Sequence, residues 1–240
     1  MNAASFTKPF GPPVLQIGSE HLEAIQDAAA RGRTVRVVAQ VKRQSAAAFN
    51  VVATIAGTRS DLAPVCVMTP RSGWHANASE RGGGLACWLE TMRAVAAART
   101  ARTVRFIASS GHELGHLGLR AHLDRNAGLA QKAVAWVHLG ANIGASTGDT
   151  RMTPSDDGLA SAAARALRPY GLDTIGRGPA AQVAGEAATI KEQNGRFISF
   201  IGQNAWFHNP KDLWPDAVDI AVVARFARAV ADLTVALAIS

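Results

Sequence analysis

Polar, charged and aromatic side chains that could form a reaction centre lie at or just after the ends of four of the apolar segments in this sequence. They are Arg71, Trp74 and Glu80 after residues 63–70; His112 and Glu113 after residues 102–110; His138 and Asn142 at the end of residues 132–144; and Trp206 and His208 after residues 196–204. Carboxylates and imidazoles are common metal ligands, and both transfer protons in enzymes. The pattern therefore predicts a reaction centre of the acid-base or metal-assisted type.

Residues 112–116 read HELGH, which is an H-E-x-x-H sequence. On a helix this spacing places both histidines on one face, where they can hold zinc while the glutamate acts as a base. His122 lies ten residues after the first histidine, where a third ligand would stand in one subclass of such enzymes. However, Gly118 stands one position too early for the turn before that ligand, and the motif directly follows a predicted strand. A zincin site is therefore the weaker interpretation.

The elements that must position these side chains are predicted by hydrophobic periodicity. The expected strands cover residues 33–41, 49–58, 63–70, 102–110, 132–144 and 196–204, and the expected helices cover 19–31, 85–99, 112–128, 156–171 and 217–238. This alternation predicts an α/β protein of three layers, with a mixed, mainly parallel sheet between helices. Ligands of such sheets bind at the carboxyl ends of the strands, where the reactive side chains lie.

Composition narrows the class of protein. The 240 residues are 48% hydrophobic and carry a net charge of +7, which indicates a globular protein with a large core. The basic residues are spread along the chain, so we expect no nucleic-acid partner. Cys66 and Cys87 lie in apolar runs and are expected to be buried thiols. We find no membrane span and no secretory signal, so the sequence as given is expected to be cytoplasmic. It leaves open whether the protein forms a homo-oligomer.

From residue 50 to the C-terminus, the order of segments resembles the co-catalytic zinc aminopeptidase family. NVVATIAG resembles the family's opening strand, and CVMTPRSGWHANASERGGGLACWLE resembles the segment with its His-x-Asp and Asp-Asn-x-x-Gly motifs. RTVRFIASSGHELGHLGLRAHL resembles the strand followed by Glu-Glu-x-Gly-x-x-Gly-Ser, WVHLGANIG the strand that bears a ligand aspartate, and WFHNPKDLWPD the final His-x-x-x-Asp. The resemblance implies a catalytic domain over residues 46–240. It also implies that residues 1–45 are a remnant of an inserted domain or an N-terminal extension.

The resemblance also implies a changed metal site. In the family a histidine and an aspartate hold one zinc, a glutamate and a histidine hold the other, and a second aspartate bridges the two. Thr69 stands in place of the first histidine, Arg71 in place of the aspartate that orients it, and Gly140 in place of the ligand aspartate. The first zinc has therefore lost both of the ligands that it does not share.

The second zinc keeps its counterparts. Glu113 and His208 match its glutamate and histidine, Glu80 replaces the bridging aspartate, and His112 replaces the family's general base. The resemblance thus implies one zinc held by Glu80, Glu113 and His208, with no metal at all as the close alternative. A histidine can act as the base because its ordinary pKa lies near neutrality. Arg71 is expected to anchor substrate or to stabilise an oxyanion.

We therefore expect a hydrolase with one metal or none, acting on a peptide, amide or related bond of a peptide or a small molecule. Trp74, Trp206 and Glu186 are the candidate substrate-binding residues. One alternative is a metal-independent glycoside or ester hydrolase in which Glu80 and Glu113 act as paired carboxylates. Another is a scaffold or binding module without catalytic activity.

Overall fold

The computed structural model describes residues 14–239 except 16, 39, 41 and 43. The chain divides into two compact units, of which the smaller covers residues 5–47. Its described part holds a short 3-10 helix, η1 (Ser19–His21), and the helix α1 (Leu22–Ala30), as predicted. The predicted strand over residues 33–41 is wrong for the residues described there, 33–38 and 40, which form no regular structure. A valine-rich segment becomes a strand only when another strand pairs with it.

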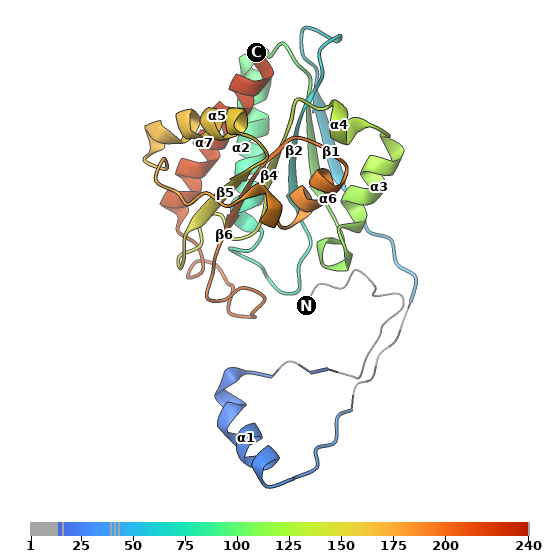
Figure 1. Cartoon of the computed structure of the whole chain (residues 1–240), viewed down its shortest axis with the longest axis vertical. Coiled ribbons are helices and arrows are strands. Elements are labelled where there is room, and N and C mark those ends of the chain that lie inside the picture. The colour runs from blue at the N-terminus through green and yellow to red at the C-terminus, as the bar shows by residue number, and fades with distance from the viewer. Residues whose placement is uncertain (1–13, 16, 39, 41, 43, 240) are drawn as a thin grey trace. The chain divides into compact units, whose positions relative to one another are not determined.

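The larger unit is built on a six-stranded sheet, in the order β1-β3-β2-β4-β6-β5 (Figure 1). The strands are β1 (Val51–Ile55), β2 (Val65–Pro70), β3 (Val104–Ser109), β4 (Ala135–Leu139), β5 (Thr150–Pro154) and β6 (Phe197–Gly202). The four central strands are parallel, and β1 and β5 run antiparallel at the two edges. The predicted mixed, mainly parallel sheet is confirmed, although the edge strand β5 was not predicted.

Helices cover both faces of this sheet, which confirms the three-layer architecture (Figure 1). One face carries α2 (Gly82–Ala98), α5 (Asp157–Leu167) and α7 (Ile220–Ile239), and the other carries α3 (Leu117–Arg125), α4 (Leu129–Lys132) and α6 (Glu186–Glu192). Three further 3-10 turns are η2 (His112–Leu114), η3 (Arg168–Tyr170) and η4 (Ala180–Gln182). The predicted helix over residues 112–128 is therefore interrupted, since η2 and α3 are separate elements.

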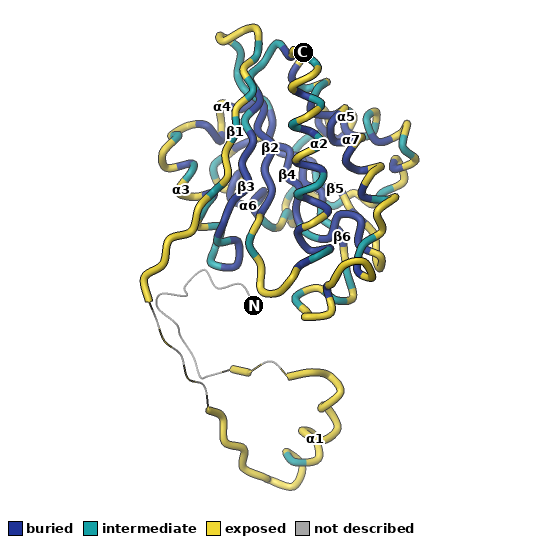
Figure 2. Tube along the Cα trace, turned by 180° about the vertical axis from the view of Figure 1, so that it is seen from behind, coloured by how far each residue is buried: buried dark blue, intermediate teal, exposed yellow. Residues whose placement is uncertain are grey.

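Each central strand contributes to two apolar cores, because its side chains alternate between the faces. In β2, Val65 and Val67 pack with α2 and α7, whereas Cys66 and Met68 pack with α3, α4 and α6. Figure 2 shows these strands as the most deeply buried part of the larger unit. The predicted burial of both cysteines is confirmed, and burial raises the pKa of the Cys66 and Cys87 thiols to about 12.

The glycine run at the start of α2 allows close packing. A side chain at Gly83 would overlap the carbonyl oxygen of Ile143, and one at Gly84 would lie 2.9 Å from Thr69 Oγ1. The first turn of α2 can therefore approach the ends of β2 and β4 directly. This packing holds Glu80 and Arg81, which immediately precede the helix, at the carboxyl edge of the sheet.

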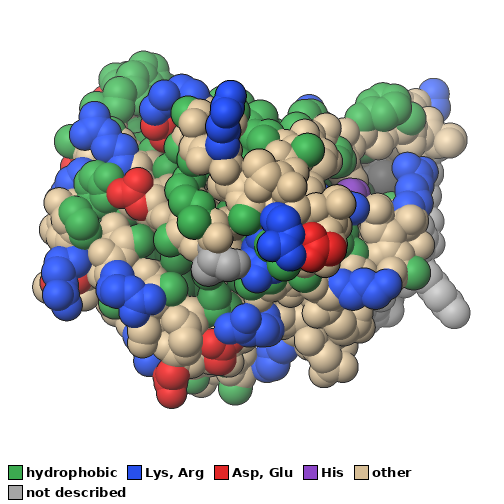
Figure 3. Space-filling model, turned by 90° about the horizontal axis from the view of Figure 1, so that it is seen from above, with side chains coloured by type: hydrophobic (Ala, Val, Ile, Leu, Met, Phe, Trp, Pro, Cys, Tyr) green, Lys and Arg blue, Asp and Glu red, His purple; other side chains and the backbone are tan. Residues whose placement is uncertain are grey.

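The surface shows no dense basic patch on the side seen in Figure 3, where Lys and Arg side chains are scattered among hydrophobic and acidic ones. None of the helices in the described ranges combines the length and the apolar character needed to cross a bilayer.

Candidate active site

Five of the predicted side chains meet at the carboxyl edge of the sheet in two adjoining groups: Glu80, His112, Glu113, His138 and His208. The first contains Glu80, Arg81, Glu113 and His208. The second is centred on Glu186, the first residue of α6. The groups are joined at η2, where Glu113 belongs to the first group and the preceding histidine to the second.

Arg81 lies between the two carboxylates of the first group. Its Nη2 is 2.9 Å from Glu80 Oε1 and 2.8 Å from Glu113 Oε1, and all three side chains are at least 94% buried. Its Nε donates a hydrogen bond of 2.6 Å to the carbonyl oxygen of Ser72. A guanidinium group is always charged in proteins, so it supplies a fixed positive charge between two buried acids. Arg81 is not among the site residues predicted from the sequence.

Glu80 is held rigidly but is incompletely paired. Its amide donates to Asp212 Oδ2 at 2.9 Å, and its Oε1 lies 3.3 Å from His208 Nε2. The contacts of Glu80 Oε1 with His208 Nε2 and with Arg81 Nη2 are close, but their angles are not those of hydrogen bonds. Both carboxylate oxygens and His208 Nε2 therefore lack a hydrogen-bond partner among the residues that the structure describes. Burial lowers the pKa of His208, so the neutral imidazole is favoured.

Zinc held by Glu80, Glu113 and His208 does not fit this geometry. The unpaired atoms of Glu80 and His208 are suitable donors, but the space between the two carboxylates is taken by the Arg81 guanidinium at contact distance from both. A Zn²⁺ ion at that point would meet a fixed positive charge. With Arg81 in this position the ligand set that the resemblance implies does not fit a zinc ion, because the arginine already supplies the positive charge between the two carboxylates.

Thr69 and Gly140, which stand in place of two ligands of the family's first zinc, have structural roles here. Thr69 is buried, and its hydroxyl donates to the carbonyl oxygen of Leu139 at 2.8 Å. A side chain at Gly140 would lie 2.6 Å from Ile201 Cγ1, so a larger residue fits there only if its neighbours shift. Neither position supplies a metal ligand.

Arg71 forms neither a hydrogen bond nor an ion pair with Glu80 or Glu113. Its Nη1 donates to the carbonyl oxygen of Phe49 at 2.7 Å and to Ser110 Oγ at 2.9 Å. It therefore joins the end of β3 to the segment before β1. The ion pairs to Glu80 and Glu113 come from Arg81 instead.

Ser72 connects the two groups of side chains. Its hydroxyl donates to Glu113 Oε2 at 3.0 Å and accepts a hydrogen bond of 3.1 Å from the amide of His112. Burial acts to raise the pKa of Glu113, but hydrogen bonds from its own backbone, Arg81 and Ser72 outweigh burial and lower the pKa. Glu113 is therefore an anchored anion at neutral pH.

The second group is a chain of hydrogen bonds centred on a fully buried carboxylate. Because a carboxylate only accepts, His112 Nδ1 donates to Glu186 Oε1 at 2.9 Å, and His138 Nε2 donates to Oε2 at 3.3 Å. His138 Nδ1 then accepts from Ser199 Oγ at 2.7 Å. Burial acts to raise the pKa of Glu186, but the two imidazoles outweigh it and hold that pKa well below its usual range.

The HELGH residues do not form the helix that a zincin site requires. Gly111 and Gly115 have φ values of +72° and +80°, and His116 follows with φ of +61°. This left-handed backbone turns His116 toward Glu186, while Glu113 faces Arg81. The zincin hypothesis is therefore wrong in its geometry, because the glutamate between the histidines is paired with an arginine. His122 lies on α3, where its carbonyl oxygen accepts a hydrogen bond from Asn126.

A cavity of about 760 Å³ opens beside the second group. Its lining is His112, His138, Gly140, Ala141, Asn142, Thr147, Gly148, Ala184, Gly185, Ile201, Gly202, Gln203, Asn204, Ala205 and Phe207. Two of the predicted substrate-binding residues, Trp74 and Trp206, do not line it. The third, Glu186, lies behind the wall as the partner of His112. Phe207 is the aromatic side chain that reaches the cavity.

Sequence reasoning missed Arg81, His138 as a partner of Glu186, and Ser199. A signal existed for Arg81, because it follows Glu80 directly and precedes a helix. His138 and Ser199 lie opposite each other on the neighbouring strands β4 and β6. The spacing of residues along the chain does not reveal which residues of two strands lie opposite each other.

Neither a protein-family model nor a curated protein matches this sequence. Solved structures do match. The aminopeptidase from Aneurinibacillus sp. strain AM-1 has a TM-score of 0.65 at 16% identity, over 76% of this chain and 46% of that one. The zinc aminopeptidase BSAP from Bacillus subtilis has a TM-score of 0.65 at 17% identity, over 76% and 48%. The chain has the fold of these aminopeptidases.

A third match is the peptidase M28 precursor from Shewanella amazonensis SB2B, with a TM-score of 0.65 at 16% identity over 80% of this chain and 45% of that one. The chain thus spans about half the length of each of these proteins. The zinc-aminopeptidase-like fold predicted from the order of motifs is confirmed. At such low identity the likeness concerns the fold, and the chemistry must be argued from the side chains present.

Proposed function

We propose that this chain is a hydrolase of the aminopeptidase fold that cleaves a peptide, amide or ester bond with His112 as general base. The observation that carries the proposal is the 2.9 Å hydrogen bond between His112 Nδ1 and the fully buried Glu186, at the wall of the 760 Å³ cavity. A base oriented by a buried acid beside a cavity is the arrangement that water-activating hydrolases use.

The role of His112 follows from its hydrogen bonds. With its Nδ1 proton held by Glu186, the neutral ring has its lone pair on Nε2, which can accept a proton from water. Glu186 remains ionised because its pKa is held low, so it stabilises the imidazolium that forms. His138, fixed by Ser199, keeps the other oxygen of Glu186 in place. The proton taken by His112 then passes to the leaving group.

Glu80 and Glu113 are poor candidates for glycoside hydrolysis. That reaction needs one carboxylic acid with a raised pKa beside an ionised one. Both carboxylates here share one arginine nitrogen, and the pKa of Glu113 is lowered. Their contacts support a positioning role, in which Arg81 and Ser72 fix the turn that carries His112.

The test is turnover of chromogenic aminoacyl anilides and p-nitrophenyl esters by the purified full chain, with and without a chelator. We expect activity that survives chelation. We also expect His112→Ala and Glu186→Gln to lower kcat at least about 100-fold with unchanged circular dichroism, since general-base catalysis contributes roughly 10²–10⁴-fold.

His122→Ala is the matched control, because this histidine lies on α3 and contacts no member of the Glu186 group by a hydrogen bond or ion pair. Its activity should equal that of the unaltered chain. Absence of turnover with every substrate would favour the scaffold alternative, and activity that disappears on chelation would contradict the metal-independent mechanism.

A further inference from the structure

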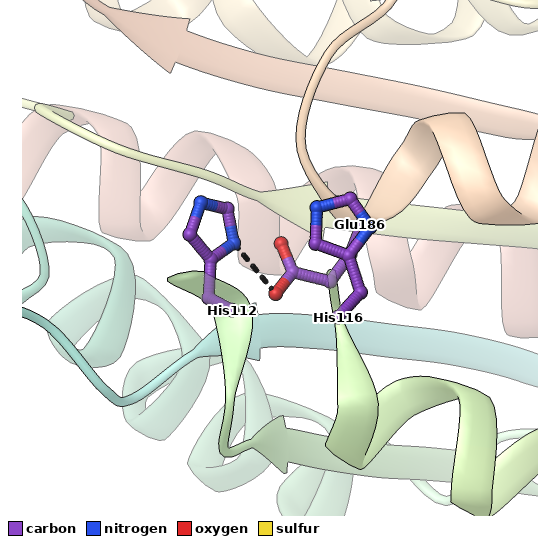
Figure 4. A group of neighbouring side chains, drawn as sticks. All are labelled: His112, His116 and Glu186. Atoms are coloured by element: carbon purple, nitrogen blue, oxygen red, sulfur yellow. Dashed lines mark hydrogen bonds and ion pairs between the residues drawn. The ribbon is translucent and has the colours of Figure 1, made fainter. Parts of the chain in front are cut away.

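Two imidazoles and one carboxylate converge where the turn after β3 meets the start of α6. Ligand atoms of His112, His116 and Glu186 all lie within 4.8 Å of one another. Figure 4 shows the two rings on either side of the Glu186 carboxylate. The ring centroids of the histidines are 5.1 Å apart, and the planes are tilted by 37°. The family-like zinc position, between Glu80 and Glu113, is a different place and is taken by Arg81.

The His116 ring is held in a fixed orientation, although His116 has no role in the proposed hydrolysis. Its Nδ1 lies 2.9 Å from Thr189 Oγ1, and its other ring nitrogen faces Glu186 and His112 (Figure 4). With the Nδ1 proton given to the threonine, the lone pair on Nε2 points into the gap between the three side chains. Reaching this position requires the left-handed backbone of His116, a conformation that costs free energy for a residue other than glycine.

The donor set is that of a transition-metal site. We propose that His112 Nδ1, His116 Nε2 and a Glu186 oxygen bind one divalent cation of the zinc class. Two histidines and a glutamate with one position open are a ligand set of catalytic zinc. Ligand atoms at about 2.0–2.2 Å from a zinc ion lie roughly 3.3–3.5 Å from one another. The ligand atoms of the three side chains lie within 4.8 Å of one another, so small side-chain rotations would bring them to this separation.

The surroundings supply the outer contacts that metal sites need. Thr189 orients His116, and Ser109 Oγ donates to Glu186 Oε1 at 3.3 Å. Such partners fix the tautomer and direction of the ligands, and their loss typically weakens metal binding 10–100-fold. His112 borders the cavity, which gives a cation access from solvent.

One consequence rests on the proposed function. The cation would replace the proton that His112 shares with Glu186, so a metal-bound His112 cannot act as the base. Binding of the cation and the proposed hydrolysis exclude one another, and Zn²⁺ is expected to inhibit turnover.

The experiment measures binding directly and does not depend on activity. The full chain is stripped with chelator, dialysed, and titrated with Zn²⁺ by calorimetry and with Co²⁺ by visible absorption. We expect one ion per chain and the strong absorption of four-coordinate cobalt. His116→Ala should weaken binding at least about tenfold, and Thr189→Val should weaken it within the 10–100-fold range of outer contacts. His122→Ala, the control histidine, should bind as the unaltered chain does.

Several outcomes would overturn the site: no ion bound, affinity unchanged by His116→Ala, or affinity lost on Glu113→Gln but kept in His116→Ala. The last result would place the ion at Glu80, Glu113 and His208. Circular dichroism of each variant separates loss of ligand from loss of fold. Binding that follows these expectations in a chain without turnover would support the cation site and contradict the hydrolase proposal, so the two failures are distinguishable.

Discussion

At the scale of single residues, the two carboxylates nearest the start of α2 receive their counter-charge from Arg81. Unlike a bound ion, a guanidinium group is covalently attached and cannot be removed by chelation. Burying two acids without such a partner is costly, since an uncompensated buried charge destabilises the folded state. Arg81 therefore contributes to the integrity of the site whatever reaction occurs there.

Arg81→Ala should lower the free energy of unfolding by about 3–5 kcal/mol, because it leaves Glu80 and Glu113 buried without a counter-charge. Urea denaturation of the full chain measures this loss. The control is Arg93→Ala, whose exposed ion pair with Glu90 should contribute less than about 1 kcal/mol. Adding Glu113→Gln to Arg81→Ala should recover part of the stability. A loss as small as that of the control would contradict the assigned role of Arg81.

At the scale of elements, residues 112–128 illustrate how a local pattern can mislead. Their apolar spacing predicts one helix, but Gly111, Gly115 and His116 adopt left-handed backbone and divide it into η2 and α3. The break lets Glu113 face Arg81 while His112 and His116 face α6.

The start of α5 provides a test of local stability. Asp156 accepts from the amide of Leu159 at 3.0 Å and pairs with Arg196 at 3.1 Å. Asp156→Ala should lower the free energy of unfolding at pH 7 by about 1 kcal/mol, the usual cost of losing an N-cap. Asp156→Asn, which can still cap the helix, should cost less. Equal losses in both variants would show that the charge, and not the cap, is decisive.

The contribution of the Asp156 carboxylate to stability should depend on pH. Burial acts to raise the pKa of Asp156, but the Arg196 and Leu159 hydrogen bonds outweigh it and lower the pKa. A group whose folded-state pKa is lowered stabilises the fold above its unfolded-state pKa, near 3.9, and loses this effect as pH falls through the folded-state value. The stability difference between Asp156→Ala and the unaltered chain should therefore shrink as pH is lowered from 5 toward 2 in denaturation experiments.

At the scale of the whole molecule, the two units contribute very differently to burial. Among the described residues from 14 to 47, all but Ala28 are exposed, and α1 has no buried residue. The larger unit contains both apolar cores. The predicted boundary, which separates residues 1–45 from a catalytic domain over 46–240, stays a proposal that this difference supports.

A chain that begins at residue 46 should therefore fold by itself. We expect its melting temperature to lie within about 2 °C of that of the full chain, since roughly 1 kcal/mol corresponds to 2–4 °C at this size. Thermal denaturation followed by circular dichroism measures the difference. A fall of more than about 8 °C would show that the N-terminal residues stabilise the larger unit.

The sequence by itself determined the alternation of strands and helices, the burial of Cys66 and Cys87, and the edge of the sheet at which the reactive side chains meet. These features follow from hydrophobic periodicity and from the geometry of parallel sheets, both of which act along the chain or between neighbouring elements. The order of motifs also predicted the aminopeptidase fold, which the solved structures confirm.

Only the tertiary structure decided which charged groups contact one another. Arg71 and Arg81 are equally basic in the sequence, yet Arg81 alone reaches both Glu80 and Glu113. Likewise, Glu186 becomes the partner of His112 across 74 positions of sequence. Such contacts depend on backbone angles at a few residues and on the register of neighbouring strands. The packing of the whole domain sets these angles and this register, so no local pattern of residue types determines them.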